Sequence, residues 1–276
     1  MENNTYLMDI ESDTELARLQ VQESLFNELI DLFPPQFVPG AGKRILDVAC
    51  GPAGWLLKVI QTHQEMSGIG VDLSVRMIRY ARAQAEARGL AVQLSIMDIL
   101  QPWNFPDAHF DLVNARFING MLPVLAWSRL FQECWRVLRP GGVVRHTEFA
   151  HVSTPNSPSA EKLTMLTYAA IYKAGQMFSP YAMGANAILA QTLKQVGFTN
   201  IILIPYLVDY SYGTSLHQLM YKDLQISNEH LKPFLAKMQV APAEELDRLR
   251  EEWEKEWQNK NFCGHWYLSS MSAVKP

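Results

Sequence analysis

Residues 45–55 read ILDVACGPAGW, an apolar run that passes through an acid into a turn of small residues. Asp47 stands near the end of the run, and Ala49, Gly51 and Gly54 follow it through the turn. Small residues let the backbone approach a ligand closely, because no side chain occupies the ligand's space. The stretch therefore predicts a strand, a ligand-binding turn and the start of a helix.

Around this stretch, short β-branched runs alternate with amphipathic segments from residue 43 to residue 149. The runs are RILDVA, GIGVDL, VQLSIM, FDLVNA and GGVVRHTEF. Such alternation predicts a parallel sheet with helices on both faces. Two further runs, TNIILIPYLVDY at 199–210 and HWYLSSMSAV at 265–274, bring the predicted strands to seven. The fold class is therefore α/β with a mostly parallel sheet.

The chain divides into four predicted parts. Residues 1–40 form an N-terminal helical lid, because Ser12 to Glu15 has the form of a capping box and leucines follow at helical spacing. Residues 41–150 form the core. Residues 151–185 form a helical cap insertion after a Ser/Pro-rich loop. Residues 186–276 complete the core and carry a helical insertion at about 213–260.

Composition restricts the function classes. A net charge of −4 and a pI near 6.0 give no broad basic surface, so nucleic acid is a poor partner. The acidic N-terminus is unlike a signal peptide, and no apolar run reaches membrane-spanning length, so we expect a cytoplasmic protein with no membrane partner. Cys50, Cys134 and Cys263 are scattered, and neither a disulfide framework nor a metal site is expected.

Four motifs in order resemble those of one family. ILDVACGPAGW is followed by GIGVDLSVRMIRYARAQA at 68–85, SIMDIL at 95–100 and ECWRVLRPGGVVRHTEF at 133–149. Over about residues 43–149 the chain resembles the class I S-adenosylmethionine-dependent methyltransferases. One departure is Ala49, which stands where the family most often has glycine. The resemblance implies a Rossmann-like sheet and S-adenosyl-L-methionine as cofactor, with S-adenosyl-L-homocysteine as its product.

The resemblance also implies a cofactor site at the carboxyl ends of the strands. In the family, the matching acids hold the methionyl end (Asp47), both ribose hydroxyls (Asp72) and the adenine amino group (Asp98), with apolar residues against the ring. The cofactor-binding residues expected on this basis, with Asn114 at the end of the fourth strand and Tyr6 in the lid, are Asp47, Ala49, Gly51, Gly54, Asp72, Leu73, Met77, Met97, Asp98, Ile99, Asn114 and Tyr6.

On the acceptor side, His146 and Glu148 alternate on one face of the predicted fifth strand, and His151 lies just past it. A hydroxyl or ammonium acceptor needs a base, so Glu148, His151 and His146 are the catalytic candidates, against the plain alternative of a structural hydrogen bond. Arg116 at the end of the fourth strand is a candidate for holding an anionic acceptor group. The expected substrate-binding residues are Arg116, Phe117, Tyr168, Tyr172, Tyr181 and Tyr210.

These features predict methyl transfer to an oxygen, nitrogen or activated carbon of a small apolar or aromatic acceptor, in specialised metabolism, by a homodimer or higher homo-oligomer. Three alternatives stay open. Carbon methylation of an alkene such as a prenyl diphosphate would use the same parts. An NAD-dependent oxidoreductase would fit the turn read as A-x-G-x-x-G, although Tyr172 breaks a Tyr-x-x-x-Lys pattern that begins at Tyr168. A cofactor-binding protein without catalysis is the third.

Overall fold

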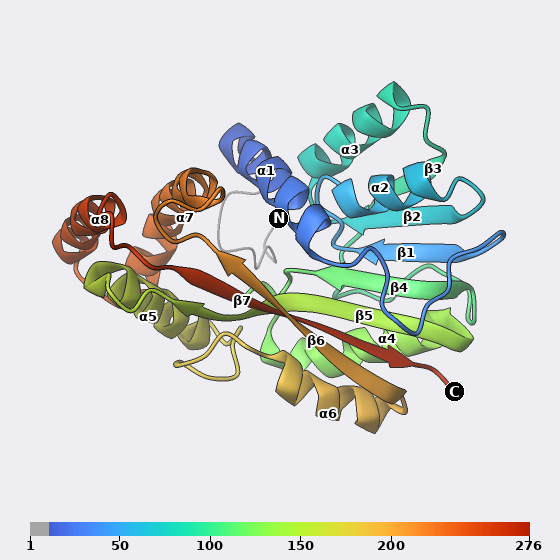
Figure 1. The fold of residues 1–276 in the computed structure, drawn as a ribbon. Coiled ribbons are helices and arrows are strands. Elements are labelled where there is room, and N and C mark those ends of the chain that lie inside the picture. Colours follow the sequence, from blue (N-terminus) through green and yellow to red (C-terminus); the bar gives the residue numbers. More distant parts are fainter. Residues whose placement is uncertain (1–10) are drawn as a thin grey trace.

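The seven strands join one sheet in the order β3-β2-β1-β4-β5-β7-β6 (Figure 1). In this computed structural model, which describes residues 11–276, β1 to β5 are parallel and β7 runs antiparallel to β5 and β6. The strands are β1 Arg44–Val48, β2 Ser67–Asp72, β3 Val92–Ile96, β4 Phe110–Arg116, β5 Leu138–Ser153, β6 Thr199–Asp209 and β7 His265–Val274. The predicted α/β fold is confirmed.

One expected strand end is wrong. β5 continues to Ser153, so His151 lies inside the strand and not just past it. The reason is the long antiparallel partner: β7 pairs with β5 as far as His265 opposite Ser153, with one irregularity between Phe149 and His151. Backbone hydrogen bonds from a strand more than a hundred residues away thus extend β5 beyond the point that its own sequence predicts.

Apart from α1, the helices fall into two groups (Figure 1). The helices are α1 Asp13–Leu29, α2 Gly54–Thr62, α3 Val75–Ala87, α4 Trp127–Val137, α5 Pro158–Lys173, α6 Asn186–Val196, α7 His217–Met238 and α8 Ala243–Trp257, with a 3₁₀ turn at Val124–Ala126. In the first group, α2 and α3 cover one face of the sheet and α4 and α6 the other. In the second, α5, α7 and α8 gather beyond the ends of the long strands. No helix in the described part of the chain is long and apolar enough to cross a membrane.

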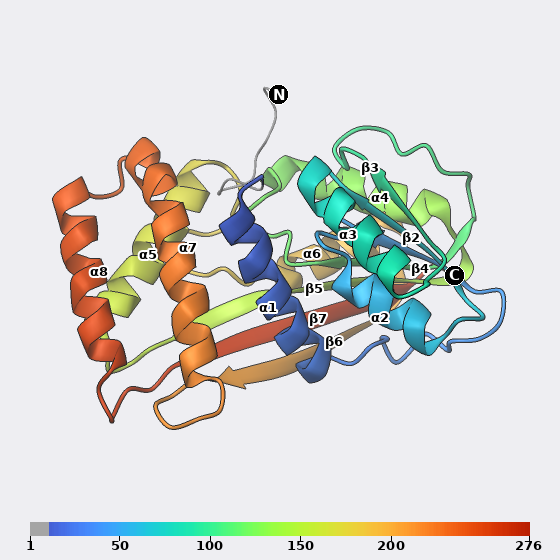
Figure 2. The ribbon, with the colours of Figure 1, turned by 90° about the horizontal axis from the view of Figure 1, so that it is seen from above.

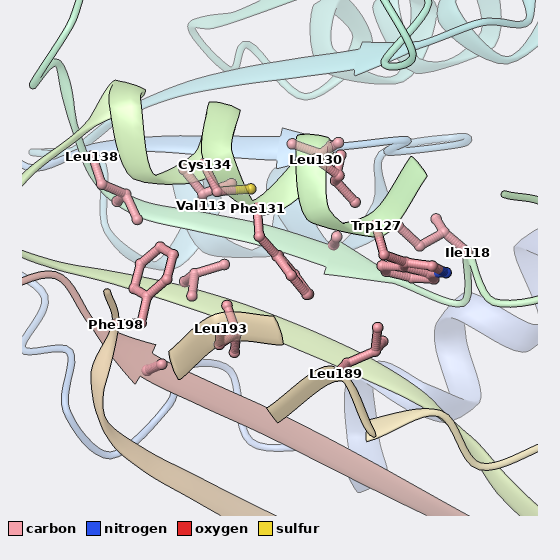
Figure 3. Packing of buried hydrophobic residues seen from close by; sticks show 14 of the residues in the cluster. Val113, Ile118, Trp127, Leu130, Phe131, Cys134, Leu138, Leu189, Leu193 and Phe198 are labelled. Carbon is pink, nitrogen blue, oxygen red and sulfur yellow. The ribbon is translucent and has the colours of Figure 1, made fainter. Parts of the chain in front are cut away.

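We call β1 to β4 with α2, α3 and α4 the parallel half, and α5, α7 and α8 with the outer ends of β5, β6 and β7 the cap. Figure 3 shows part of the apolar cluster in which α4 and α6 pack on the sheet. Trp127, Phe131, Leu189 and Leu193 there are almost fully buried. A separate buried cluster fills the cap and is rich in tryptophan. The two halves therefore have separate cores.

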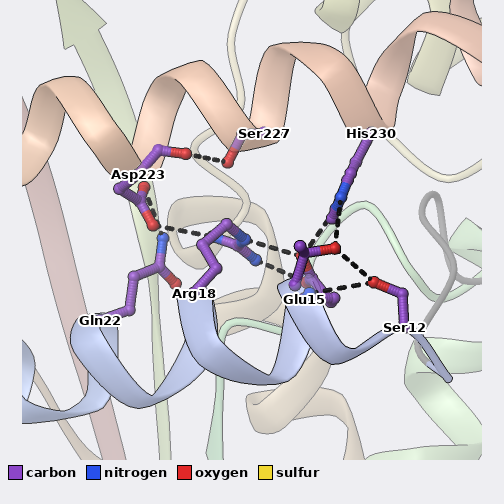
Figure 4. A network of polar contacts seen from close by, with 8 residues as sticks. Ser12, Glu15, Arg18, Gln22, Asp223, Ser227 and His230 are labelled. Carbon is purple, nitrogen blue, oxygen red and sulfur yellow. Dashed lines mark hydrogen bonds and ion pairs between the residues drawn. The ribbon is translucent and has the colours of Figure 1, made fainter.

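Helix α1 lies between α7 of the cap and the helices of the parallel half (Figure 2). A buried polar network holds it against α7 (Figure 4). The guanidinium of Arg18 donates to both oxygens of Glu15 at 2.8 and 2.7 Å and to Asp223 of α7 at 3.1 Å. Gln22 donates to the other oxygen of Asp223 at 3.0 Å. The hydroxyl of Ser12 caps α1 by accepting the amide of Glu15, as the sequence predicts.

Candidate active site

A cavity of about 370 Å³ lies where the carboxyl ends of β1, β2 and β4 meet the cap. Its walls come from α1, from the segments after these strands and after β3, and from α5, α7 and α8. The predicted site residues that line it are Asp47, Ala49, Gly51, Asp72, Leu73, Met77, Met97, Asp98, Ile99, Arg116, Phe117, Tyr168 and Tyr210. Ligands of open α/β sheets bind at this edge, so the location is that of a ligand site.

Asp72 joins the turn after β1 to the end of β2. One of its carboxylate oxygens accepts the amide of Gly51 at 2.8 Å, and the other accepts the amide of Ser74 at 2.9 Å. Burial raises the pKa of Asp72, while the two amides act in the opposite direction. An ionised carboxylate accepts about four hydrogen bonds, so Asp72 can still accept from a ligand in the cavity. Two adjacent hydroxyl groups would match this pair of oxygens.

Three residues of the turn after β1 have a left-handed backbone conformation. Ala49 has φ 52°, Gly51 54° and Ala53 62°. Glycine adopts this region freely, whereas an alanine there costs roughly 1 kcal/mol or more. The departure at Ala49 is therefore accommodated in the turn with some local strain.

Apolar side chains form a slot beside Asp72. Leu73 is 44% exposed although it is apolar, and it lines the cavity together with Met77, Met97 and Ile99. Asp98 stands at the edge of this slot and accepts the amide of Leu100 at 2.9 Å. An apolar slot with an acceptor at its rim suits a flat ring that carries an amino group.

Asp47 is held by a chain of buried polar groups. Asn114 donates to Asp47 at 2.6 Å, and Arg145 donates to Asn114 at 2.7 Å. Burial raises the pKa of Asp47 to about 6, opposed by Arg116 and Asn114. Asn114 is fully buried and is not among the cavity-lining residues, so in this structure it positions Asp47. Arg145 was not anticipated from the sequence.

Glu23 of α1 reaches across to the start of α2. Its carboxylate accepts the amide of Gly54 at 2.8 Å and lines the cavity, although Gly54 itself does not. Burial raises the pKa of Glu23 to about 7, and Arg116 opposes this rise. Arg116 also lowers the pKa of Asp47, so three charged groups influence one another at this corner. A ligand with both an ammonium and a carboxylate group would complement them.

The three catalytic candidates do not line the cavity. Glu148 is 1% exposed, and its carboxylate accepts the amide of Asn119 at 2.6 Å. His146 is equally buried, and its Nδ1 lies 2.8 Å from the side-chain oxygen of Asn186. His151 is exposed and packs near the ring of Tyr267. Asn119, which does line the cavity, was missed because it follows β4 in an irregular segment without a motif.

The remaining predicted residues differ in burial and in whether they line the cavity. Tyr168 is 5% exposed and Tyr210 is fully buried, and both lie in the wall that the cap contributes. Tyr172 is 47% and Tyr181 81% exposed, and neither lines the cavity. Tyr6 falls outside the described residues.

Comparison with known proteins finds a family that the middle of the chain matches. Residues 45–142 match the family described as "Methyltransferase domain". Phosphoethanolamine N-methyltransferase of Triticum aestivum is 29% identical over 136 residues, which cover 49% of this chain and 24% of that protein. Demethylmenaquinone methyltransferase of Thermus thermophilus is 37% identical over 109 residues, 40% of this chain and 48% of that protein. The matches thus span less than half of these relatives' own length.

The fold has solved counterparts. Phosphoethanolamine N-methyltransferase 2 of Haemonchus contortus, in complex with phosphomonomethylethanolamine and S-adenosylhomocysteine, superimposes with a TM-score of 0.53. The superposition covers 98% of this chain and 60% of that one at 19% identity, which supports the fold alone. The matched segment contains the turn after β1, the acid that ends β2 and the acid after β3. Residues 45–142, which match the methyltransferase-domain family, thus bring these residues to one cavity on a sheet of this fold.

Proposed function

We propose that this protein transfers a methyl group from S-adenosylmethionine to a small-molecule acceptor held under the cap. The observation that carries the proposal is that one cavity is lined both by the acids at the strand ends and by the aromatic wall of the cap. A donor and an acceptor that share one enclosed space can be aligned for transfer, and such positioning is a large part of the rate enhancement.

The donor set fits this cofactor. Asp72 would accept the ribose hydroxyls, since an ionised carboxylate takes about four hydrogen bonds and the amides of Gly51 and Ser74 use one on each oxygen. Asp98 would accept the adenine amino group, with Met97 and Ile99 beside the ring, since all three line the cavity. Asp47 and Glu23 would take the methionyl ammonium and Arg116 the carboxylate, each through a charge-assisted hydrogen bond. The cofactor itself supplies an electrophilic methyl group on a sulfonium.

Arg116 therefore has a different proposed role from the one expected from the sequence. Its guanidinium donates to the side-chain oxygen of Asn27 at 3.0 Å and interacts with Asp47 and Glu23. These contacts tie it to the methionyl corner, so we assign it to the cofactor and not to the acceptor. Burial lowers its pKa, while the two acids raise it.

Glu148 acts through Asn119 in this proposal. Its carboxylate fixes the amide of Asn119, whose side-chain amide also donates to the carbonyl of Met183 at 2.5 Å. Asn119 is thereby held at the cavity wall between the cofactor residues and the cap. Glu148 is a positioning residue on this view.

Calorimetric titration tests the proposal directly. The wild-type protein should bind S-adenosylmethionine and S-adenosylhomocysteine, and Asp72→Ala should weaken both by about 100-fold because two charge-assisted hydrogen bonds to the ribose are lost. Asp107→Ala is the matched control, since Asp107 is 78% exposed and precedes β4 at the opposite edge of the sheet. Binding of NAD with no binding of either methionine derivative would overturn the proposal.

A further inference from the structure

The cavity wall changes character along its length. Every charged residue among the described lining residues lies at or before position 116, and these are Arg18, Glu23, Asp47, Asp72, Asp98 and Arg116. From Phe117 onward the lining contains no charged side chain. Leucines and aromatic rings of α5, α7, α8 and β7 form most of it, with Leu163, Leu224 and Leu231 among them. A buried charge on a ligand would find no counter-ion on these elements, and Arg18 of α1, which lies beside α7, is already paired with Glu15 and Asp223.

Four donors in this uncharged part have no acceptor among the described residues, although the hydroxyl oxygen of Tyr168 also interacts with the backbone amide of Val152. They are the hydroxyls of Tyr168 and Tyr210 and the indole nitrogens of Trp257 and Trp266. Each residue is at most 5% exposed, and all four line the cavity. Buried polar groups are nearly always hydrogen-bonded, so four unpaired donors around one cavity indicate a ligand that accepts.

The geometry fixes these groups in place. Tyr210 stacks on Trp257 with ring centroids 5.3 Å apart and an interplanar angle of 4°, and it meets the edge of Trp266 at 6.1 Å. Gly264 supplies the room for the tyrosine ring, because a Cβ at that position would overlap it. His217 stacks on Trp257 at 5.3 Å. Tyr210 and His217 both stack on the ring of Trp257, whose indole N–H is buried without an acceptor.

The two tyrosines approach the cavity from different elements, Tyr168 from α5 and Tyr210 from the end of β6. Burial raises the pKa of Tyr168 to about 12 and raises that of Tyr210 further, with Tyr168 adding to the second shift. Both phenols therefore stay neutral donors at physiological pH. A neutral donor suits a carbonyl, ether or hydroxyl oxygen in an otherwise apolar molecule.

We propose that the cap holds the end of the acceptor remote from the methyl donor, and that this end is uncharged, mainly apolar and carries a hydrogen-bond-accepting oxygen. That this molecule is the methyl acceptor rests on the proposed function. The binding preference itself rests only on the unpaired donors and on the absence of charge in this part of the described lining.

Three probes of the same shape test it by calorimetry: 2-acetylnaphthalene, 2-ethylnaphthalene and 2-naphthoate. The ketone should bind about three- to tenfold more tightly than the hydrocarbon, because its oxygen gains one or two buried hydrogen bonds. The carboxylate should bind at least about tenfold more weakly than the ketone, because its charge is buried unpaired. Equal binding of ketone and hydrocarbon, or tightest binding of the carboxylate, would overturn the proposal.

The double variant Tyr168→Phe/Tyr210→Phe removes two donors and keeps both rings. The preference for the ketone should fall to about twofold or less, and affinity for the hydrocarbon should stay unchanged. Tyr172→Phe is the matched control, one helical turn from Tyr168 on α5 but 47% exposed and outside the lining. An unchanged preference in the double variant contradicts the assignment of these hydroxyls. If the double variant does not fold, the wild-type comparison of the three probes still decides.

A parallel titration with S-adenosylhomocysteine separates this inference from the proposed function. Binding of the cofactor product without any preference for the ketone would contradict the inference about the cap and leave the proposed function standing. A ketone preference without binding of the cofactor product would support the cap site and remove the proposed methyl transfer.

Discussion

The parallel half and the cap wall the same cavity but are built on different principles. In the parallel half, acids at strand ends are held by backbone amides a few residues away or on the next strand, as Asp72 is by Gly51 and Ser74. In the cap, aromatic rings from four elements pack on one another and leave hydroxyl and indole edges without partners. The parallel half therefore presents charged side chains that backbone hydrogen bonds hold in place. The cap presents a packed apolar surface with a few neutral hydrogen-bond donors.

Helix α1 contacts both halves. Its Glu23 contacts the turn of the parallel half, while Arg18 and Gln22 contact Asp223 of the cap. Burial raises the pKa of Asp223 and Arg18 opposes the rise, so the pairing keeps this carboxylate ionised more readily. The position of α1, and with it one wall of the cavity, depends on these charges being paired.

The largest effect is expected from breaking that junction. Arg18→Met should lower the free energy of unfolding by about 3–5 kcal/mol, because it leaves the buried carboxylates of Glu15 and Asp223 without their guanidinium. Urea denaturation measures the loss. Arg248→Met removes an exposed pair with Glu252 and should change stability by about 0.5 kcal/mol or less. A loss below about 1 kcal/mol in Arg18→Met would mean that apolar packing alone docks α1.

Alanine substitution of one glycine in each half compares how rigidly the two halves are packed. Gly264→Ala places a Cβ against the stacked ring of Tyr210, and it should cost about 2–3 kcal/mol because the ring has no room to move. Gly70→Ala places a Cβ 2.8 Å from the Cδ2 of Leu94, the end of a flexible side chain, and should cost about 1 kcal/mol. Thermal unfolding of the two variants gives the comparison. Equal losses would show that the cap is no more rigid than the parallel half.

The pH dependence of stability tests the corner where α1 meets the turn. The folded-state pKa of Glu23 is raised from 4.5 to about 7, so its stabilising contribution is complete below pH 4.5 and is lost as the pH rises through 7. Relative to Glu23→Gln, the wild type should therefore lose about 2 kcal/mol of unfolding free energy between pH 5 and pH 8. Urea denaturation at both pH values measures it.

Glu28→Gln is the control for this measurement, since Glu28 is an exposed acid on the same helix. It should keep the pH slope of the wild type. A Glu23→Gln variant with the wild-type slope would contradict the raised pKa and the enclosed position of that carboxylate.

The smallest effect concerns the turn. Ala49→Gly removes a Cβ from a residue at φ 52° and should raise stability by at most about 1 kcal/mol, since the flexible unfolded chain offsets part of the relieved strain. Affinity for S-adenosylhomocysteine should not change. Ala83→Gly, at an exposed position inside α3, should instead lower stability by about 1 kcal/mol. The same sign in both variants would show that Ala49 is not strained.

The sequence by itself predicted the sheet and most of the proposed cofactor site. Strand, turn and helix follow one another within about 12 residues around Asp47, so alternation of apolar runs and small residues is enough to locate them. Parallel strands present their carboxyl ends at one edge, and Asp47, Asp72 and Asp98 consequently come together without further information. These placements depend on local structure and on a general rule of topology.

Only the tertiary structure decided which of the remaining side chains face the cavity. The period of two that puts His146 and Glu148 on one face of β5 could not reveal that Asn119 and Asn186 would contact them there. Glu23 meets Gly54 across 31 residues, and Arg18 meets Asp223 across 205. Local propensity carries no information about such pairs, because long-range packing brings them together and sets which side chain is buried, paired or left facing a ligand.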